Sequence, residues 1–249
     1  MSRDHGGTLA ENSTAPRRTD HKDGMHHMAK HQLFDENVLV IGLGRFGAAA
    51  ALEMDRLGYR VHAIEINGNV AERYARKLMR VQTIDATNPE ELKTAKPRDF
   101  RVAVVGIGTS IEGSLLTVGN LVDLGIESIW AKAVSAEHAR LLERIGVHHV
   151  IFPEAESGGR VAHLVNGKME GYIEFEDGYA IVKMRPAQEM IGFTLGETDI
   201  RKRYGVTVVG VKAPGEDFMH ALPETKVGQH HMMIVSGPSK YIEQLAARP

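Results

Sequence analysis

The chain has 249 residues, of which 43% are hydrophobic and 25% are charged, a composition typical of a globular protein that can bury a sizeable core. Its formal net charge of -2 gives no reason to expect nucleic acid or an anionic membrane surface as a partner. The absence of cysteine excludes disulfide bonds, thiolate metal sites and cysteine nucleophiles, and it suits a reducing, cytoplasmic compartment.

Residues 1–35 form the first distinct segment. They are rich in serine, threonine, aspartate, arginine and histidine and contain no apolar run long enough for a signal peptide or a membrane span. A segment of this composition cannot bury enough apolar surface to offset its ordering entropy. We therefore expect a disordered leader or tag.

From Asn37 onwards, short apolar runs alternate with amphipathic stretches, a pattern typical of a parallel sheet with crossover helices. Strands are predicted at residues 38–41, 61–64, 81–84, 102–105, 128–131 and 149–152. Helices are predicted at residues 46–57, 70–77, 89–94, 112–124 and 136–145, and three of them stop at a glycine that suits a left-handed C-cap, namely Gly58, Gly125 and Gly146. The sequence therefore predicts an α/β fold, a Rossmann-like doubly wound sheet, over residues 36–153.

The remaining chain is predicted as a crossover helix and a small α+β domain. The helix begins near Glu154 and ends by Gly171, so that residues 154–170 link the two domains. In residues 171–249 we expect a hairpin that turns at Asp177–Gly178, one short helix near 195–204, strands at 206–211 and 231–235, and a last helix from Pro238.

A glycine-rich loop, GLGRFG, joins the first predicted strand to the first predicted helix. In such a loop Gly42 permits the tight turn, Gly44 lets backbone amides approach phosphate, and Gly47 lets the helix pack closely on the sheet. Glu65 ends the second strand, where a carboxylate can accept hydrogen bonds from ribose hydroxyls and repels a 2′-phosphate. The loop therefore predicts a site for NAD or an adenosine phosphate rather than for NADP.

Two further charged residues belong to this predicted site. Asp85 follows the third strand, where it can face the adenine, although an N-cap or turn role is an equal alternative. Arg45 lies inside the loop, where its charge suits a polyphosphate. The candidate nucleotide-binding residues are Gly42, Gly44, Arg45, Phe46, Gly47, Glu65, Asp85, Ala86 and Thr87.

The sequence offers little for catalysis. A hydride-transfer enzyme needs a second pocket and a general acid or base near the reacting atom. The histidines of the folded part lie in patterns typical of surface or packing positions, and no Walker-type phosphate loop is present. We therefore predict a nucleotide-binding protein without catalytic residues, with an NAD-dependent oxidoreductase as an alternative.

The segments VIGLGRFG, IDAT, VGIGTSIEGSLLTVGNLVDLGIESIWAKA and HARLLERIGVHHVIFPEAESGGRVA resemble the regulatory RCK (KTN) subunits of bacterial potassium transport systems, of the KtrA type. The segment IRKRYGVTVVGVKAPG resembles the RCK C-terminal domain. The resemblance covers almost everything after Asn37, and the motifs occur in the family's order and spacing.

This resemblance implies a cytoplasmic subunit that assembles from dimers into an eight-membered ring beneath a membrane potassium-translocating partner. It implies binding of ATP or ADP, with Arg45 reaching a terminal phosphate, Glu65 holding the ribose and Asp85 near the adenine. Glu154 resembles a residue that joins Mg²⁺ or another divalent cation at the dimer interface; it also suits a helix-start carboxylate that interacts with the helix dipole, and both roles can hold together.

The resemblance also leaves alternatives open. In several relatives the C-terminal domain binds cyclic di-AMP, for which Arg201 and Arg203 are candidates, although a basic run on a helix is more often a solvated face. An NAD(H)-sensing subunit of the Trk type shares the fold but usually carries two such modules in one chain, so the single module here favours the KtrA type.

Overall fold

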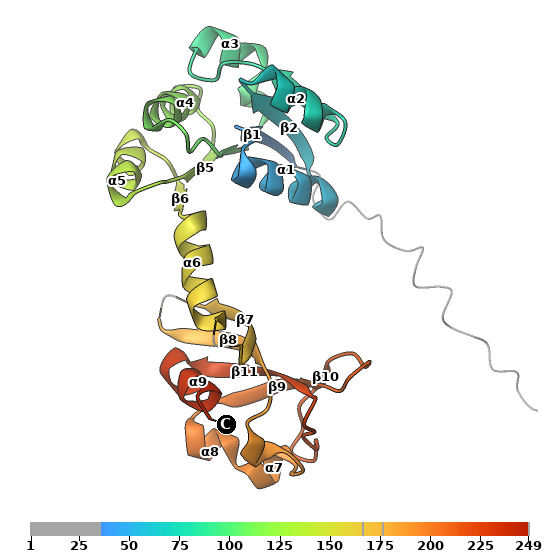
Figure 1. Cartoon of the computed structure of the whole chain (residues 1–249). Helices are drawn as coiled ribbons and strands as arrows, with labels where there is room; N and C mark the ends of the chain where they lie inside the picture. The colour runs from blue at the N-terminus through green and yellow to red at the C-terminus, as the bar shows by residue number, and fades with distance from the viewer. Residues whose placement is uncertain (1–35, 166, 176, 249) are drawn as a thin grey trace, which may run out of the picture. The chain divides into compact units, whose positions relative to one another are not determined.

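The computed structural model describes residues 36–165, 167–175 and 177–248 (Figure 1). The described residues divide into two compact units, the first ending at Ile151 and the second beginning at Phe152. The predicted leader, residues 1–35, lies outside the described residues. In the part of the chain that is described, no helix is both long and apolar enough to cross a membrane.

The first unit is built on a parallel sheet, six-stranded in its described part, with the strand order β3-β2-β1-β4-β5-β6. Its strands are β1 (Asn37–Ile41), β2 (Arg60–Glu65), β3 (Arg80–Thr83), β4 (Val102–Val105), β5 (Ser128–Lys132) and β6 (His149–Ile151). Its α-helices are α1 (Arg45–Leu57), α2 (Gly68–Ala75), α3 (Pro89–Thr94), α4 (Ile111–Asp123) and α5 (Ala136–Ile145). The predicted Rossmann-like order and every predicted element of this unit are confirmed to within two residues.

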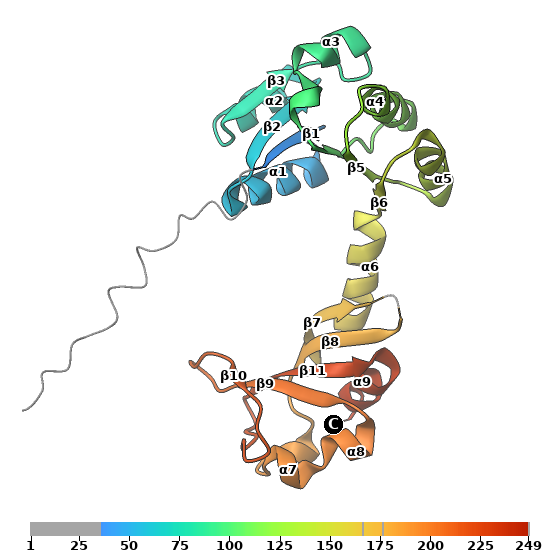
Figure 2. The same ribbon diagram turned by 180° about the vertical axis from the view of Figure 1, so that it is seen from behind.

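Strand β1 is central and apolar because helices cover both faces of the sheet. Residues 38–41 are at most 2% exposed. On one face the buried side chains of β1 and β2 pack with Ala48 and Ala51 of α1 and with Val70 of α2. Helices α4 and α5 lie side by side in both Figure 1 and Figure 2. An alternating strand would suit a half-exposed sheet, whereas these continuous apolar runs require this double cover.

The three glycines predicted to end helices all adopt positive φ angles. They are 97° at Gly58, 76° at Gly125 and 107° at Gly146. Gly58 and Gly146 donate backbone hydrogen bonds to carbonyls of the last turns of α1 and α5. These helices therefore end as predicted, in left-handed caps that favour glycine.

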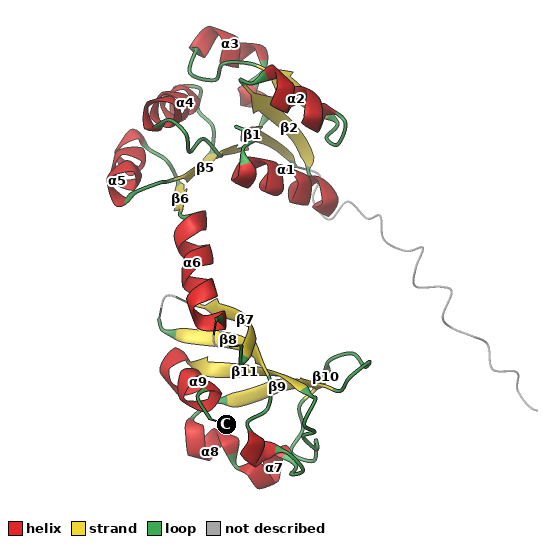
Figure 3. Cartoon of the chain, in the orientation of Figure 1, coloured by secondary structure: helices red, strands yellow, loops and turns green. Residues whose placement is uncertain are grey.

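The second unit contains an antiparallel sheet, five-stranded in its described part, with the strand order β10-β9-β11-β8-β7. Figure 3 shows its strands in yellow and its helices in red. The strands are β7 (Met169–Glu174), β8 (Tyr179–Met184), β9 (Thr207–Lys212), β10 (Met219–His220) and β11 (Met232–Pro238). The α-helices are α6 (Pro153–Leu164), α7 (Leu195–Thr198), α8 (Ile200–Tyr204) and α9 (Ser239–Ala246).

The core of the second unit lies between its sheet and its C-terminal helix. The fully buried side chains of β8 and β11 form one apolar cluster with Ile242 and Leu245 of α9. The predicted hairpin turn is confirmed, with Gly178 at a φ of 73° between β7 and β8. The small α+β architecture expected for this part of the chain is present.

Two predictions about the second unit are wrong in detail, and one short strand was missed. The helix expected to reach Gly171 ends at Leu164, because Gly167 takes a left-handed φ of 73° and the chain then enters β7. The single helix expected at residues 195–204 is divided by Asp199, whose φ is 49°. The short strand β10 was not predicted, since two residues carry no periodic pattern.

Candidate nucleotide site

Three glycines meet where β1 and β4 end. Gly42 has a φ of 87°, a left-handed conformation that favours glycine. A Cβ atom on Gly47 would lie 1.9 Å from the Gly42 carbonyl oxygen, and one on Gly106 would lie 3.0 Å from the same oxygen. Helix α1 can therefore start this close to the sheet only because these positions lack side chains, as predicted for Gly42 and Gly47.

Gly44 has a different environment. It is the N-cap of α1, its φ is -64°, and a Cβ atom placed on it would have no heavy atom within 4 Å. Gly44 lines a cavity, and the N-terminus of α1 lies at the edge of that cavity. Backbone amides and the positive end of the helix dipole suit an anion at such a position.

The cavity has a volume of about 530 Å³ and follows the carboxyl ends of β1, β2, β3 and β4. It lies at the point where the connections of β1 and β4 diverge, which is where doubly wound folds bind ligands. Glu65 and Asp85 line it, whereas no lysine, arginine or histidine of the described residues does. The polar groups that line the cavity and can donate to an anion therefore include backbone amides and the hydroxyls of Thr109 and Ser110.

Glu65 is buried, 9% exposed, and both of its carboxylate oxygens accept backbone hydrogen bonds. Oε2 accepts from the Leu43 amide at 2.6 Å, and Oε1 accepts from the Asn67 amide at 2.9 Å. These charge-assisted bonds tie the glycine loop to the end of β2. Each oxygen keeps a second lone pair, so the carboxylate can still accept from the hydroxyls of a ribose.

Asp85 stabilises the loop that follows β3. Its Oδ1 accepts from the Thr87 amide at 3.0 Å and from the Thr87 hydroxyl at 2.7 Å. The N-cap of α3 is Asn88 rather than Asp85, so of the two structural alternatives the turn role is the one observed. Asp85, Ala86 and Thr87 all line the cavity, and their contact with adenine stays a prediction.

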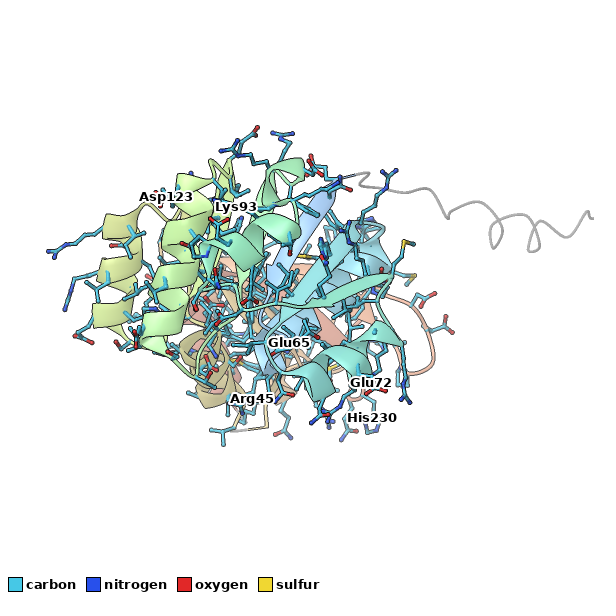
Figure 4. All side chains as sticks on the ribbon, turned by 90° about the horizontal axis from the view of Figure 1, so that it is seen from above. Arg45, Glu65, Glu72, Lys93, Asp123 and His230 are labelled. Atoms are coloured by element: carbon cyan, nitrogen blue, oxygen red, sulfur yellow. The ribbon has the colours of Figure 1, made fainter. Side chains whose placement is uncertain are left out.

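The other two loop candidates do not line the cavity. Arg45 is exposed in the first turn of α1, and its side chain forms no hydrogen bond or ion pair with any described residue. Figure 4 labels the exposed Arg45 and the buried Glu65. Phe46 is half-buried against the apolar cluster around β1 and α1. The structure therefore gives Phe46 a packing role and leaves Arg45 available to a ligand.

The segment after β4 and helix α4 form a second wall of the cavity. The sequence did not predict these residues as part of the site. Ser110 caps α4 by accepting from the Gly113 amide at 2.9 Å. Asn120 Nδ2 donates to the carbonyl oxygens of Ala86 and Thr87, both at 3.0 Å. Helix α4 therefore positions the loop after β3. The signal in the sequence was a second glycine pair, Gly106 and Gly108, after a buried strand.

Glu154 does not find a metal-binding set within its own chain. It lies in the first turn of α6, where a carboxylate suits the helix dipole. No three histidine, aspartate or glutamate side chains among the described residues are grouped so that they could hold a metal ion. The position at the helix start is the one observed, and a role of Glu154 in a cation site at a dimer interface stays a prediction.

The basic residues predicted for cyclic di-AMP lie on α8 of the second unit and have partners within it. Arg201 Nε donates to the Thr207 hydroxyl at 3.3 Å. Arg203 forms an ion pair with Glu189 at 2.7 Å. Their role in binding a dinucleotide stays a prediction.

Comparison with known proteins identifies the family. The model of the TrkA-N domain family matches residues 38–153. The chain is 32% identical over 206 residues to Ktr system potassium uptake protein A of Bacillus subtilis, a match that covers 82% of this chain and 93% of that protein. This chain belongs to the Ktr family of potassium uptake proteins. As a KtrA-type chain it is a regulatory, non-enzymatic subunit, so the oxidoreductase alternative is wrong.

Solved structures confirm the RCK fold. The GsuK RCK domain superimposes with a TM-score of 0.60 and 17% identity, over 86% of this KtrA-type chain and 48% of that one. The GsuK channel bound to NAD gives a TM-score of 0.59 and 16% identity, over 86% of this chain and 40% of that chain. The chain thus spans about half or less of the GsuK chains that it matches.

Proposed function

We propose that this KtrA-type chain is a cytoplasmic nucleotide sensor that gates a membrane potassium-translocating subunit. The sensor adopts one conformation when it binds ATP and another when it binds ADP. The observation that carries the proposal is the cavity at the carboxyl ends of β1 to β4, which joins a helix N-terminus for phosphate to a buried carboxylate for ribose. The role in potassium transport is supported by the similarity to Ktr system potassium uptake protein A.

The proposed working form is a dimer-based ring of eight subunits, held at the inner face of the cell membrane by its partner. A ligand can shift such an assembly between two shapes only through its difference in affinity for them. Coupling energies of about 1–3 kcal/mol are typical of such allosteric links. A group that senses only the terminal phosphate of ATP could supply this difference.

We assign that role to Arg45. The cavity has no cationic side chain among its described lining residues, and Arg45 stands exposed next to Gly44, which does line it. A guanidinium forms strong, charge-assisted hydrogen bonds to phosphate oxygens. It could reach a terminal phosphate bound in its own chain or, across a dimer interface, one bound in a second copy.

The variant Arg45→Ala should keep its affinity for ADP and lose most of its preference for ATP. A charge-assisted contact contributes about 1.5–3 kcal/mol, so ATP binding should weaken by at least about tenfold. Isothermal titration calorimetry with ATP and with ADP measures both affinities. The matched control is Arg56→Ala, since Arg56 is exposed on the same helix but pairs with Glu53 at the opposite end.

Equal loss of ATP and ADP affinity in Arg45→Ala, with Arg56→Ala unchanged, would contradict the assignment of Arg45 to the terminal phosphate. Unchanged affinities in both variants would contradict it as well. Either result would leave the cavity itself as the nucleotide site.

A second candidate is the sensing of NAD or NADH. The observation that favours it is the fold shared with a channel solved with NAD bound, together with a carboxylate, Glu65, in the position that suits an unphosphorylated ribose. In that case Arg45 would face no terminal phosphate, and its replacement would have little effect on the affinity for NAD.

A further inference from the structure

The basic turn, residues 73–80, joins the end of α2 to the start of β3 (Figure 2). Its sequence is RYARKLMR, which places four cations and no acidic residue within eight positions. The turn is tight, because the amides of Lys77 and Leu78 both donate to the Tyr74 carbonyl oxygen at 2.9 Å. A chain whose formal net charge is -2 thus carries a concentrated positive charge at one defined place.

Two apolar side chains attach the basic turn to the core. Leu78 is 3% exposed, and Tyr74 packs partly buried against the same apolar cluster, the one around β1 and α1. The rest of the turn faces solvent, namely Arg73, Ala75, Arg76, Lys77, Met79 and Arg80. Met79 is 95% exposed, although burial of a methionine side chain is favourable. The turn therefore presents one long apolar side chain among four cations.

Three of the four cations have no acidic partner in the described part of the chain. Arg76 pairs with Glu72 at 3.3 Å. Arg73, Lys77 and Arg80 form no ion pair with any described residue. Basic side chains at the end of a helix stabilise it through the helix dipole, which suits Arg73 in the last turn of α2. That role does not extend to Arg80, which begins β3, so the helix end explains only part of the positive charge.

This combination suits an anionic membrane surface. A single exposed methionine is ordinary, but an apolar side chain among unpaired cations can enter the lipid interface while the cations attract phosphate groups. Flexible, unpaired side chains can also follow a fluid layer of headgroups, whereas recognition of one acidic peptide is typically built on fixed positions.

The basic turn lies away from the nucleotide cavity. It precedes β3, so it lies at the amino ends of the parallel strands, whereas the cavity follows their carboxyl ends. Strand β3 is also the outermost strand on its side of the described order. Contact of the turn with a membrane would therefore leave the cavity open.

We propose that the basic turn is an anionic-lipid contact, in which Arg73, Lys77 and Arg80 attract phosphate headgroups and Met79 enters the interface. The contact goes beyond the proposed function, because it brings the first unit to the bilayer directly rather than through the translocating partner. It needs anionic headgroups and no nucleotide.

The test is co-sedimentation of the full chain with vesicles of phosphatidylcholine, with and without phosphatidylglycerol. The unmodified chain should bind only the vesicles that contain phosphatidylglycerol, and more weakly as salt is added. A variant that combines Arg73→Gln, Lys77→Gln and Arg80→Gln should bind these vesicles about 100-fold more weakly, at about 1 kcal/mol for each lost cation. Met79→Gln should weaken binding without changing its salt dependence, because salt does not screen an apolar contact.

The matched control combines Lys93→Gln, Arg140→Gln and Arg144→Gln, which removes the same charge from exposed positions elsewhere in the first unit. It should bind the vesicles nearly as tightly as the unmodified chain. All the variants should keep the melting temperature of the unmodified chain, because the replaced side chains are exposed. Equal binding by the two triple variants would overturn the inference. So would the absence of binding to phosphatidylglycerol vesicles by the unmodified chain, which would instead favour an acidic protein segment as the partner of the basic turn.

Discussion

Replacing Gly47 with alanine should lower the free energy of unfolding of the first unit by about 3 kcal/mol, because the added methyl group collides with backbone. The new Cβ atom would lie 1.9 Å from the Gly42 carbonyl oxygen. No rotamer change can relieve that contact, so either α1 or the glycine loop must move. Urea denaturation followed by circular dichroism measures the loss.

Gly44→Ala is the matched control in the same loop. Its Cβ atom meets nothing within 4 Å, and its φ of -64° is open to any residue. We expect a change below about 1 kcal/mol, the cost of a weaker N-cap. If both variants were equally stable, the close packing of α1 against Gly42 would not be a feature of the folded protein.

Acid should destabilise the protein through His62, which lies on β2 and is 2% exposed. Neither ring nitrogen has a hydrogen-bond partner in the described structure. Burial, with a smaller contribution from the charge of Arg80, lowers the pKa of His62 from 6.5 to about 4, and the nearby Gln82 side chain offsets this only in part. The folded state therefore holds His62 neutral.

The direction of the pH effect follows from that lowered pKa. Between pH 6.5 and about 4 the unfolded chain binds a proton at His62 and the folded chain does not, so stability falls as the pH falls through this range. The full loss is about 3 kcal/mol, and about 2 kcal/mol of it should appear by pH 5. Above pH 6.5 His62 contributes no pH dependence.

Urea denaturation at pH 7 and pH 5 tests this effect, with His62→Leu as the variant that cannot titrate. The unmodified chain should lose about 2 kcal/mol more than His62→Leu between the two values. His230, labelled in Figure 4, is exposed, so His230→Leu should behave like the unmodified chain. Identical losses in the unmodified chain and in His62→Leu would contradict the assignment.

The sheet of the first unit could be predicted because its signal is local. Buried parallel strands need apolar residues on both faces, which gives continuous runs such as residues 38–41. Helix ends at Gly58 and Gly146 follow from the same kind of rule, since few other residues adopt their backbone angles. The position of Glu65 at the end of β2 was likewise fixed by counting along one crossover unit.

The contribution of α4 to the site could not be predicted from such rules. Asn120 meets the loop after β3, more than thirty positions away in the sequence, and Thr117 lines the cavity, only because the order of strands brings α4 to this edge of the sheet. The sequence does not show whether the hydroxyl of a threonine in an apolar helix has a hydrogen-bond partner. The sequence also did not predict the break between α7 and α8 at Asp199, because aspartate rarely adopts a left-handed conformation within a helical pattern.

The measurement that tests the central claim most directly is the melting temperature of the full chain with ATP, ADP, NAD, NADH or cyclic di-AMP, each with and without Mg²⁺. A ligand that binds only the folded state stabilises it by about 2.7 kcal/mol at a concentration one hundred times its Kd. We expect ATP and ADP to raise the melting temperature clearly. Stabilisation by NAD or NADH alone, or by none of these nucleotides, would contradict the account of an ATP- and ADP-sensing site.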